Sequence, residues 1–306
     1  MLLSLAFALA FFIPCQDAEQ RPRAQEAARA DAAAQRFDIA AALRERGVEI
    51  EFTGNQVFTR GELLDILSGD KSAAEWFVEG IAAEIAGEDK DVQKLEASLY
   101  RFISLLRSRG YLKATVRAPR VETSAAGRKL FVSVSEGALY RVGKIEFKGS
   151  KLISPERLAE MFPLKTGDAA DGEAIYEFLF GKLKKLYADK GHVQYEADAE
   201  PTFTAEPSAR EGVVDFLISV SEGKRFTLHS VEFEGNAKTA DEQLRPLLLL
   251  REGETYRQTR LDESLKQLEA TGLFERIDRD RDLNYRVNEE RAEVSVKIRL
   301  KEKSTP

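Results

Sequence analysis

The sequence has few of the residues that build metal and thiol sites. Among 306 residues there are one cysteine, Cys15, and two histidines, His192 and His229. A structural zinc site usually takes four ligands from Cys and His, and a catalytic thiol needs a neighbouring base. The two histidines lie in different repeats of the sequence, and we expect both at the surface. The composition therefore predicts no metal site and no bound cofactor.

The sequence also has no tract of basic residues and none of the common catalytic motifs. Its net charge is −6, whereas affinity for nucleic acid rests on clustered Lys and Arg, so no nucleic-acid partner is expected. No nucleophile–base pair or Gly-rich phosphate loop is present. The acidic residues Asp278, Asp280 and Asp282 belong to an alternating charge run that we interpret as a solvated loop. We do not expect an enzyme.

One apolar run, residues 2–13, stands at the start of the chain. It is too short to span a bilayer and is typical of a secretory signal, so residues 1–15 are interpreted as a signal-like segment and the protein as exported. Cys15 leaves two alternatives: a lipid-modified membrane anchor, or an unpaired residue in a removed leader. Residues 16–46, rich in Ala, Arg, Gln and Glu, predict a tether.

Three phrases of the remaining sequence are similar to one another. VEIEFTGNQVFT begins at Val48, GKIEFKGSKLIS at Gly143 and HSVEFEGNAKTA at His229. In each, alternating apolar residues end in Phe, one further residue and Gly, which predicts a strand followed by a tight turn. A short helix is expected after each turn, and Ser154 followed by Pro155 is a typical helix start.

A second helix is expected in every repeat, ending at a glycine that serves as its C-terminal cap. These glycines are Gly110, Gly191 and Gly272. The residues eleven positions earlier are interpreted as part of a stripe that faces the core. They are Leu99, Phe180 and Leu261. The first repeat carries an extra stretch at about residues 68–93, which contains the only Trp and either lengthens the helices or forms an added one.

Strict alternation of apolar and polar residues follows the first two of these glycines, and it predicts a half-buried strand. The residues concerned are Lys113, Ala114, Thr115, Val116 and Arg117 in the first repeat and Val193, Gln194, Tyr195, Glu196 and Ala197 in the second. A last alternating strand closes each repeat, at residues 130–134, 214–220 and 294–300.

The order strand, helix, helix, strand, strand, repeated three times, resembles the POTRA domain. The resemblance rests on the F-x-G turns and on the helix ends YADKGH from Tyr187 and LEATGLF from Leu268. POTRA domains precede the barrel in the outer-membrane protein assembly factor superfamily. The resemblance implies an α+β fold of three tandem βααββ domains, each a three-stranded mixed sheet covered by two helices. Their expected bounds are residues 47–137, 138–223 and 224–303.

The same resemblance implies a periplasmic location at the outer membrane and a role as an interaction protein. A barrel of some sixteen strands of about ten residues needs a far longer segment than residues 301–306, so we do not expect the given sequence to form the membrane pore itself. The expected partners are unfolded outer-membrane protein segments or a separate outer-membrane barrel protein. A different function also stays open, in which the chain is a structural adaptor of an envelope or division complex and binds no client.

The resemblance also implies that the second strand of each repeat lies at a sheet edge, where unpaired backbone groups accept an extended peptide. The ten alternating residues named above are therefore the candidate partner-binding residues. The alternative is a plain edge that its charged side chains protect from aggregation. Short connections join the repeats, and Gly137 and Gly223 within them are expected to act as hinges.

Overall fold

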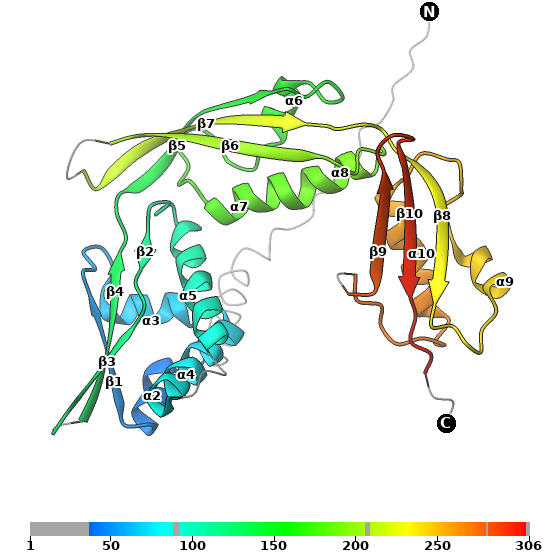
Figure 1. Ribbon diagram of the computed structural model, residues 1–306. Coiled ribbons are helices and arrows are strands. Elements are labelled where there is room, and N and C mark those ends of the chain that lie inside the picture. The colour runs from blue at the N-terminus through cyan, green and yellow to red at the C-terminus, as the bar shows by residue number, and fades with distance from the viewer. Residues whose placement is uncertain (1–36, 88–91, 126, 206–208, 280, 304–306) are drawn as a thin grey trace, which may run out of the picture. The chain divides into compact units, whose positions relative to one another are not determined.

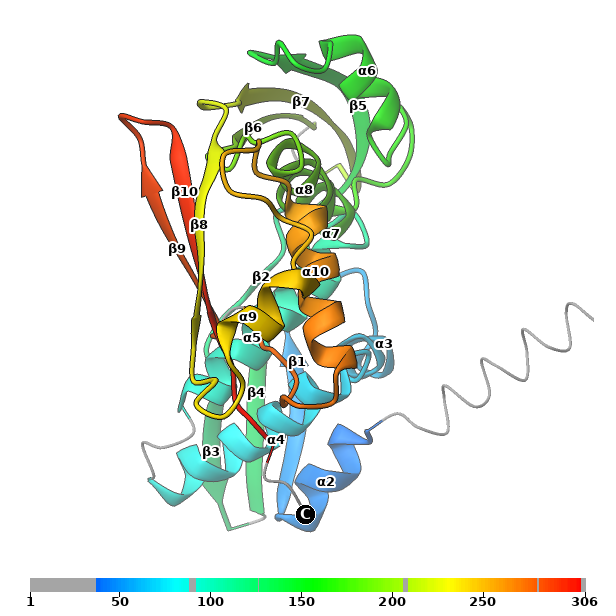
Figure 2. The same cartoon turned by 90° about the vertical axis from the view of Figure 1, so that its right-hand side faces the viewer.

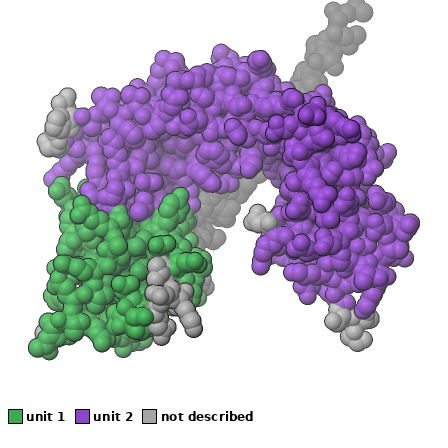
Figure 3. All heavy atoms as spheres, in the orientation of Figure 1, with its two compact units in different colours: residues 1–102, 116–134 green, residues 103–115, 135–306 purple. Residues whose placement is uncertain are grey.

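The computed structural model describes residues 37–87, 92–125, 127–205, 209–279 and 281–303 (Figure 1). The signal-like segment with Cys15, and residues 16–36 of the expected tether, lie outside this range. The described residues fall into two compact units (Figure 3): residues up to 102 together with 116–134, and residues 103–115 together with 135 onwards. The first unit holds most of the first repeat, and the second unit holds the other two repeats.

The first repeat forms a mixed sheet with several helices. Strand β1 (Val48–Thr53) pairs in parallel with β4 (Gly127–Ser135), which also pairs with β2 (Thr115–Val116) and β3 (Arg120–Ser124). The helices are α2 (Ile39–Glu45), α3 (Arg60–Leu67), α4 (Lys71–Ala86) and α5 (Val92–Arg107). The extra stretch of sequence thus forms a helix of its own, α4. The end of the expected tether is also structured, because α2 buries Ile39 and Leu43.

The second and third repeats share one topology. In the second, β5 (Leu139–Lys148) lies parallel to β7 (Glu211–Ser221), and β6 (Glu196–Thr204) pairs antiparallel on the other side of β7. In the third, the order is β8 (Thr227–Glu234), β10 (Glu293–Arg299) and β9 (Leu283–Asn288), with the same directions. The last strand of each repeat is therefore central, and the fold is the expected α+β fold of three mixed sheets with helices.

Helices cover one face of each of these two sheets, because neither layer can bury its apolar side alone. In the second repeat these are α6 (Pro155–Met161) and the continuous run α7 (Gly172–Tyr176), η2 (Glu177–Leu183) and α8 (Lys184–Ala188). In the third they are α9 (Asp241–Leu244), η3 (Arg245–Leu247) and α10 (Gln258–Ala270), all on one side of the sheet (Figure 2). Ser154 caps α6, with Pro155 at its first position, as predicted.

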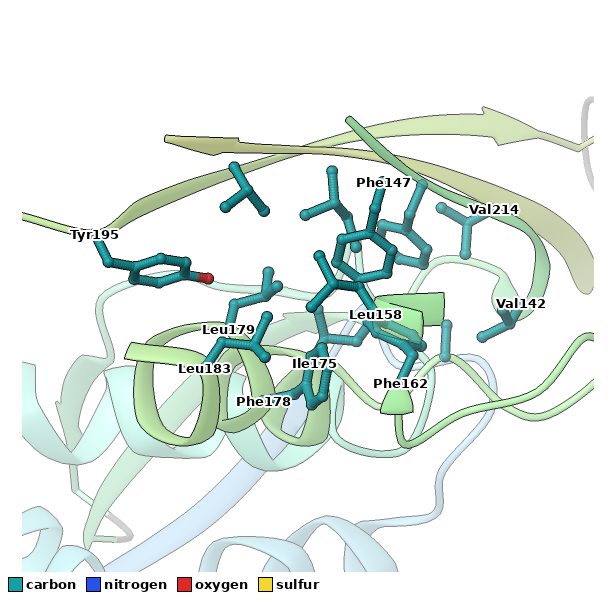
Figure 4. Close-up of a cluster of buried hydrophobic side chains, with 14 of the residues drawn as sticks. Val142, Phe147, Leu158, Phe162, Ile175, Phe178, Leu179, Leu183, Tyr195 and Val214 are labelled. Carbon is teal, nitrogen blue, oxygen red and sulfur yellow. The ribbon is translucent and has the colours of Figure 1, made fainter. Parts of the chain in front are cut away.

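Aromatic side chains fill the core of the second repeat between helices and sheet (Figure 4). The ring of Phe162 lies 6.1 Å from that of Phe147 on β5 and 5.3 Å from that of Phe178 on η2, with steep angles between the ring planes. Such edge-to-face pairs add to the free energy gained by burying the rings. Phe147 also lies 6.4 Å from Phe178, so the Phe of the F-x-G phrase connects the first strand to both helices.

The glycine of the F-x-G phrase is required for two reasons. Gly149 has a φ of 86°, and a Cβ at this position would lie 2.4 Å from the carbonyl oxygen of Val220 on the central strand. Gly235 repeats this geometry, 2.2 Å from the carbonyl oxygen of Leu300. Both the left-handed backbone and the close approach exclude a side chain. The phrase therefore marks where the turn packs onto the sheet.

The predicted core stripe of the second helix is wrong at one position. Leu261 is fully buried, whereas Phe180 is 42% exposed. The cause is η2, a stretch of π-helix that contains Phe180, takes more residues per turn than an α-helix and so changes which of its residues face the core. Phe178, Leu179 and Leu183 are buried in its place.

Candidate strand-acceptor edge

The second sheet ends in an edge strand. β6 pairs with β7 from Glu196 opposite Ser221 to Thr204 opposite Val213, and it is the last strand in the sheet order. No strand in the described part of the chain pairs with its other side. The outer row of N–H and C=O groups on β6 is therefore open to another extended chain.

Pro201 indicates which backbone groups of β6 point outward. It lies opposite Phe216 in a register without a bulge. A proline has no N–H, so an edge strand accommodates it where its nitrogen faces away from the neighbouring strand. Successive residues of a strand point their backbone groups to opposite sides, so the N–H and C=O groups of Ala197 and Ala199 also face outward.

The first repeat gives independent evidence for this orientation. There the Arg117 N–H donates to the carbonyl oxygen of Ser133 on the central strand over 3.0 Å. Asp198 and Ser219, which lie opposite each other, occupy the equivalent positions of the second repeat. The backbone of Asp198 is thus directed at β7, which again leaves its neighbours Ala197 and Ala199 directed outward.

A groove of about 500 Å³ runs beside β6, between the edge strand and the helix. Its walls include Phe180 and Lys184 from the helix and Tyr195 and Ala197 from the chain at the start of β6. The small side chain of Ala197 leaves space on the face of the edge strand that looks toward the helix. An added strand would place alternate side chains in this groove.

Two exposed aromatic side chains lie on the helix at this groove or next to it. Phe180 is 42% exposed and Tyr176 is 62% exposed, and their ring centroids are 4.9 Å apart. The sequence reasoning missed both, since it assigned Phe180 to the core. A signal was present: Ile175, Tyr176, Phe178, Leu179 and Phe180 are more large apolar residues than one face of a helix can bury.

The structure places the predicted residues of the second repeat in two groups. Glu196 and Ala197 begin β6, but Val193, Gln194 and Tyr195 precede it. The Tyr195 N–H donates to the carbonyl oxygen of His192 over 3.3 Å, so the chain turns after the helix before it extends. The prediction of a strand from residue 193 is therefore wrong. Tyr195 is only 5% exposed and points into the core (Figure 4).

The first repeat shows the same offset. Thr115 and Val116 form β2 and Arg117 follows it, whereas Lys113 and Ala114 precede it. The Ala114 N–H donates to the carbonyl oxygen of Tyr111 over 2.9 Å, which closes a turn, and Ala114 is fully buried. Apolar and polar residues also alternate in these turns, because successive side chains point alternately toward the core and toward solvent. The sequence pattern therefore did not distinguish the turns from the strands that follow them.

Two of the misplaced residues make contacts within the second unit instead. The Lys113 ammonium lies 4.3 Å from the ring centroid of Phe203 on β6 and 5.4 Å from that of Tyr140 on β5, in cation–π geometry. The Gln194 amide donates to the carboxylate of Glu289, just after β9, over 2.8 Å. Both side chains therefore join neighbouring repeats.

Glu222, the residue before Gly223, holds the turn after β5 in place. The carboxylate of Glu222 accepts hydrogen bonds from the Leu152 N–H at 2.7 Å, the Lys151 N–H at 2.8 Å and the Ser150 hydroxyl at 3.0 Å. Burial alone would raise the pKa of Glu222, but these donors outweigh it and lower the pKa. Gly137 and Gly223 have φ values of 72° and 65°, and their role as hinges stays a prediction.

Glu302 makes the corresponding contact in the third repeat. It accepts hydrogen bonds from the Lys238 N–H at 3.0 Å and the Thr239 N–H at 2.9 Å. Glu302 stands two residues after Leu300, as Glu222 stands two residues after Val220. A carboxylate after the central strand thus holds the turn after the first strand in both repeats.

The sequence predicted that the acidic run near residue 280 is a solvated loop, and this is wrong for one of its residues. Asp282 is 6% exposed, and its carboxylate accepts a hydrogen bond from the Asp278 N–H over 2.9 Å, while Asp280 lies outside the described residues. Across the described residues, His, Cys, Asp and Glu nowhere gather in a group of three or more that could hold a metal ion. The same residues include no helix with the length and apolar composition to cross a bilayer.

The fold and the repeats define the class: tandem modules in which helices cover one face of a mixed sheet with the last strand at its centre. A family model of the POTRA domain, described as "Surface antigen variable number repeat", matches residues 140–223 and 226–303, just over half of the chain. The chain belongs to the POTRA family.

Curated relatives are assembly factors of the outer membrane. The chain is 26% identical over 261 residues to the outer membrane protein assembly factor BamA of Nitratidesulfovibrio vulgaris and 23% identical over 236 residues to that of Neisseria meningitidis. These alignments cover 84% and 76% of this chain but 31% and 28% of the relatives. The chain thus spans less than a third of the length of these relatives.

A solved structure shows the same fold over most of the chain. It is the crystal structure of POTRA3-5 of BamA from Haemophilus influenzae, with a TM-score of 0.65 and 20% sequence identity. The similarity covers 83% of this chain and 94% of that one. The three tandem repeats predicted from the sequence are therefore confirmed as a fold of tandem POTRA domains.

Proposed function

We propose that this chain is a periplasmic scaffold of outer-membrane protein assembly, and that it binds extended segments of unfolded outer-membrane proteins at β6. The observation that carries the proposal is the open backbone row of β6 beside a groove with an exposed aromatic wall. Backbone hydrogen bonds at such an edge give affinity with little dependence on sequence, and the groove reads alternate side chains. This suits clients whose common property is an unfolded β-strand.

The relatives support the location and the process. Both relatives are named for outer membrane protein assembly, and the apolar run of residues 2–13 supports export. A separate outer-membrane barrel protein is the second expected partner, bound at the same edge or through the faces of the helices. Lipid modification of Cys15 would supply a further link to the membrane, and the mass of the mature N-terminus tests it.

A proline at an outward-facing position tests the proposal. Ala199→Pro removes one outward N–H without removing a hydrogen bond to β7, and Pro201 shows that β6 accommodates proline in this orientation. We expect Ala199→Pro to weaken binding of fluorescent outer-membrane-protein peptides about tenfold or more, measured by anisotropy, since the added strand loses part of its ladder. The control Ala199→Ser keeps the N–H and should bind like the wild type.

Unchanged peptide binding by a folded Ala199→Pro variant, checked by circular dichroism, would contradict the proposal. Capture of partners from solubilised membranes separates it from the adaptor function. An adaptor retains one stoichiometric partner in the Ala199→Pro variant. A client-binding scaffold captures many outer-membrane proteins and loses them in that variant.

A further inference from the structure

A second cavity, of about 540 Å³, lies between the helix of the second repeat and the edge strand of the third. Phe180 and Val193 line it from the second repeat, and Tyr256, Tyr285 and Val287 line it from the third. Tyr285 and Val287, on β9, are 43% and 44% exposed. Apolar side chains are therefore presented to solvent on both walls, as is typical of a ligand site at an interface between domains.

One wall of this cavity is an open sheet edge. β9 is the last strand of the third sheet, and no strand in the described residues pairs with its other side. The Arg299 N–H donates to the carbonyl oxygen of Asp282 over 2.7 Å, so the backbone of Asp282 is directed at β10. Because the directions alternate along a strand, the backbone groups of Tyr285 and Val287 face outward. Their side chains line the cavity, so this edge and the cavity form one site.

The far end of β9 is held in place by the second repeat. The Glu289 carboxylate accepts a hydrogen bond from the Gln194 amide of the second repeat over 2.8 Å, and its backbone carbonyl accepts one from the Lys224 ammonium, at the start of the third repeat, over 2.9 Å. The Gln194 contact joins the end of the edge strand to the repeat that supplies the opposite wall. The site is therefore preorganised rather than assembled from a loose strand.

The charge of the cavity is positive in a chain whose net charge is negative. Asp262, 7% exposed, accepts hydrogen bonds from Lys185 at 2.9 Å and Arg279 at 2.8 Å, and these two cations share one carboxylate. Burial opposes ionisation of Asp262, but Lys185 and the other donors outweigh it and hold the pKa of Asp262 below its usual value. Lys184 adds a third cation to the wall, and this residue is exposed. The cavity thus favours an acidic ligand.

We propose that β9 and this cavity form a second strand-acceptor site, which selects extended segments that carry an aromatic side chain next to a carboxylate. The strand pairs with the outward groups of Tyr285 and Val287, its aromatic side chain contacts Phe180 and Tyr285, and its carboxylate pairs with Lys184. This inference rests on the proposed function, and it adds a chemical preference that backbone pairing at β6 does not have. Phe180 and Lys184 line both grooves, so the two sites are adjacent.

The test uses the full chain and two short extended peptides with the same aromatic residues, one with Glu and one with Lys between them. Each carries p-benzoylphenylalanine at one aromatic position for crosslinking. In the Ala199→Pro background, in which binding at β6 is weakened, we expect the Glu peptide to bind about tenfold more tightly than the Lys peptide and to crosslink to β9. Lys184→Glu should abolish this preference, and Val287→Pro should remove the crosslink to β9. Val287→Thr keeps the N–H and is the control.

The possible results separate this inference from the proposed function. If the peptides crosslink only to β6 and Val287→Pro binds like the wild type, the second site is refuted and the first stands. If the Glu and Lys peptides bind β9 equally, the preference is refuted. If neither edge binds either peptide, both proposals fail. If sedimentation shows a dimer that Val287→Pro dissociates, β9 pairs with a second copy of the chain, and the inference is wrong.

Discussion

Replacing Tyr195 by Phe should stabilise the second repeat. The Tyr195 side chain lies in the core between β6 and the helix (Figure 4), and its hydroxyl has no hydrogen-bond partner among the described residues. Its ring stacks on that of Tyr187, with centroids 4.7 Å apart and an angle of 18° between the planes. Burial also raises the pKa of Tyr195, since the charged form cannot be solvated there.

The expected gain follows from the cost of an unsatisfied buried hydroxyl. Such a group costs about 1–3 kcal/mol, and Tyr195→Phe removes it without breaking a hydrogen bond. The void left by one oxygen atom offsets part of this, so we expect the free energy of unfolding to rise by about 1 kcal/mol. For a unit of this size, that corresponds to an increase in Tm of about 2–4 °C.

The neighbouring tyrosine supplies a matched control. The Tyr187 hydroxyl lies 2.6 Å from the Ser150 hydroxyl, so Tyr187→Phe breaks a hydrogen bond and should lower the free energy of unfolding by about 1 kcal/mol. Urea denaturation followed by circular dichroism measures both variants. If Tyr195→Phe destabilises the protein as much as Tyr187→Phe does, the Tyr195 hydroxyl has a partner and the reasoning is refuted.

Three other substitutions test the turn, the carboxylate and the junction between repeats. Gly149→Ala should lower the free energy of unfolding by about 2 kcal/mol or more, because the added Cβ clashes with the sheet. Gly167 is the control: its φ is 94°, but a Cβ there would have no atom within 4 Å, so Gly167→Ala should cost about 1 kcal/mol. Urea denaturation compares the two variants. Glu222→Gln should cost about 1 kcal/mol at neutral pH. Since the folded pKa of Glu222 is lowered from 4.5, that difference should vanish as the pH falls through the lowered value, which melts across acidic pH would show; a constant difference would contradict the assignment. Asp262→Ala leaves Lys185 without its partner and should lower the free energy of unfolding by about 2 kcal/mol. In a double-mutant cycle, the effects of Asp262→Ala and Lys185→Ala on this free energy should not add up; strictly additive effects would argue against the ion pair.

The repeats were predictable because each carries the same local signals. The F-x-G phrase encodes a strand and a turn that only glycine can make, as Gly149 and Gly235 show by their contact with the central strand. The fold class followed from that order of elements and from the resemblance to POTRA domains, whereas the central position of the last strand in each sheet came from the structure. The start of α6 at Ser154 also followed from local capping chemistry alone.

The candidate site was less predictable, for two physical reasons. Alternation of side chains does not distinguish a strand from the turn before it, so Lys113 and Tyr195 were assigned to edges although they lie in turns. A π-helical stretch changes the helical period, so counting back from Gly191 assigned the exposed Phe180 to the core. The cavity beside β9 depends on residues from two repeats, and no pattern within one repeat encodes it.

Helix α10 begins without a capping side chain of its own. The carboxylate of Asp189, at the end of the preceding repeat's helix, accepts hydrogen bonds from the Thr259 N–H at 3.2 Å and from the Thr259 hydroxyl instead. One domain thus completes the secondary structure of the next. The third domain, prepared in isolation, should show a frayed first turn in this helix and faster amide exchange there, so its folding is coupled to the neighbour that precedes it along the chain.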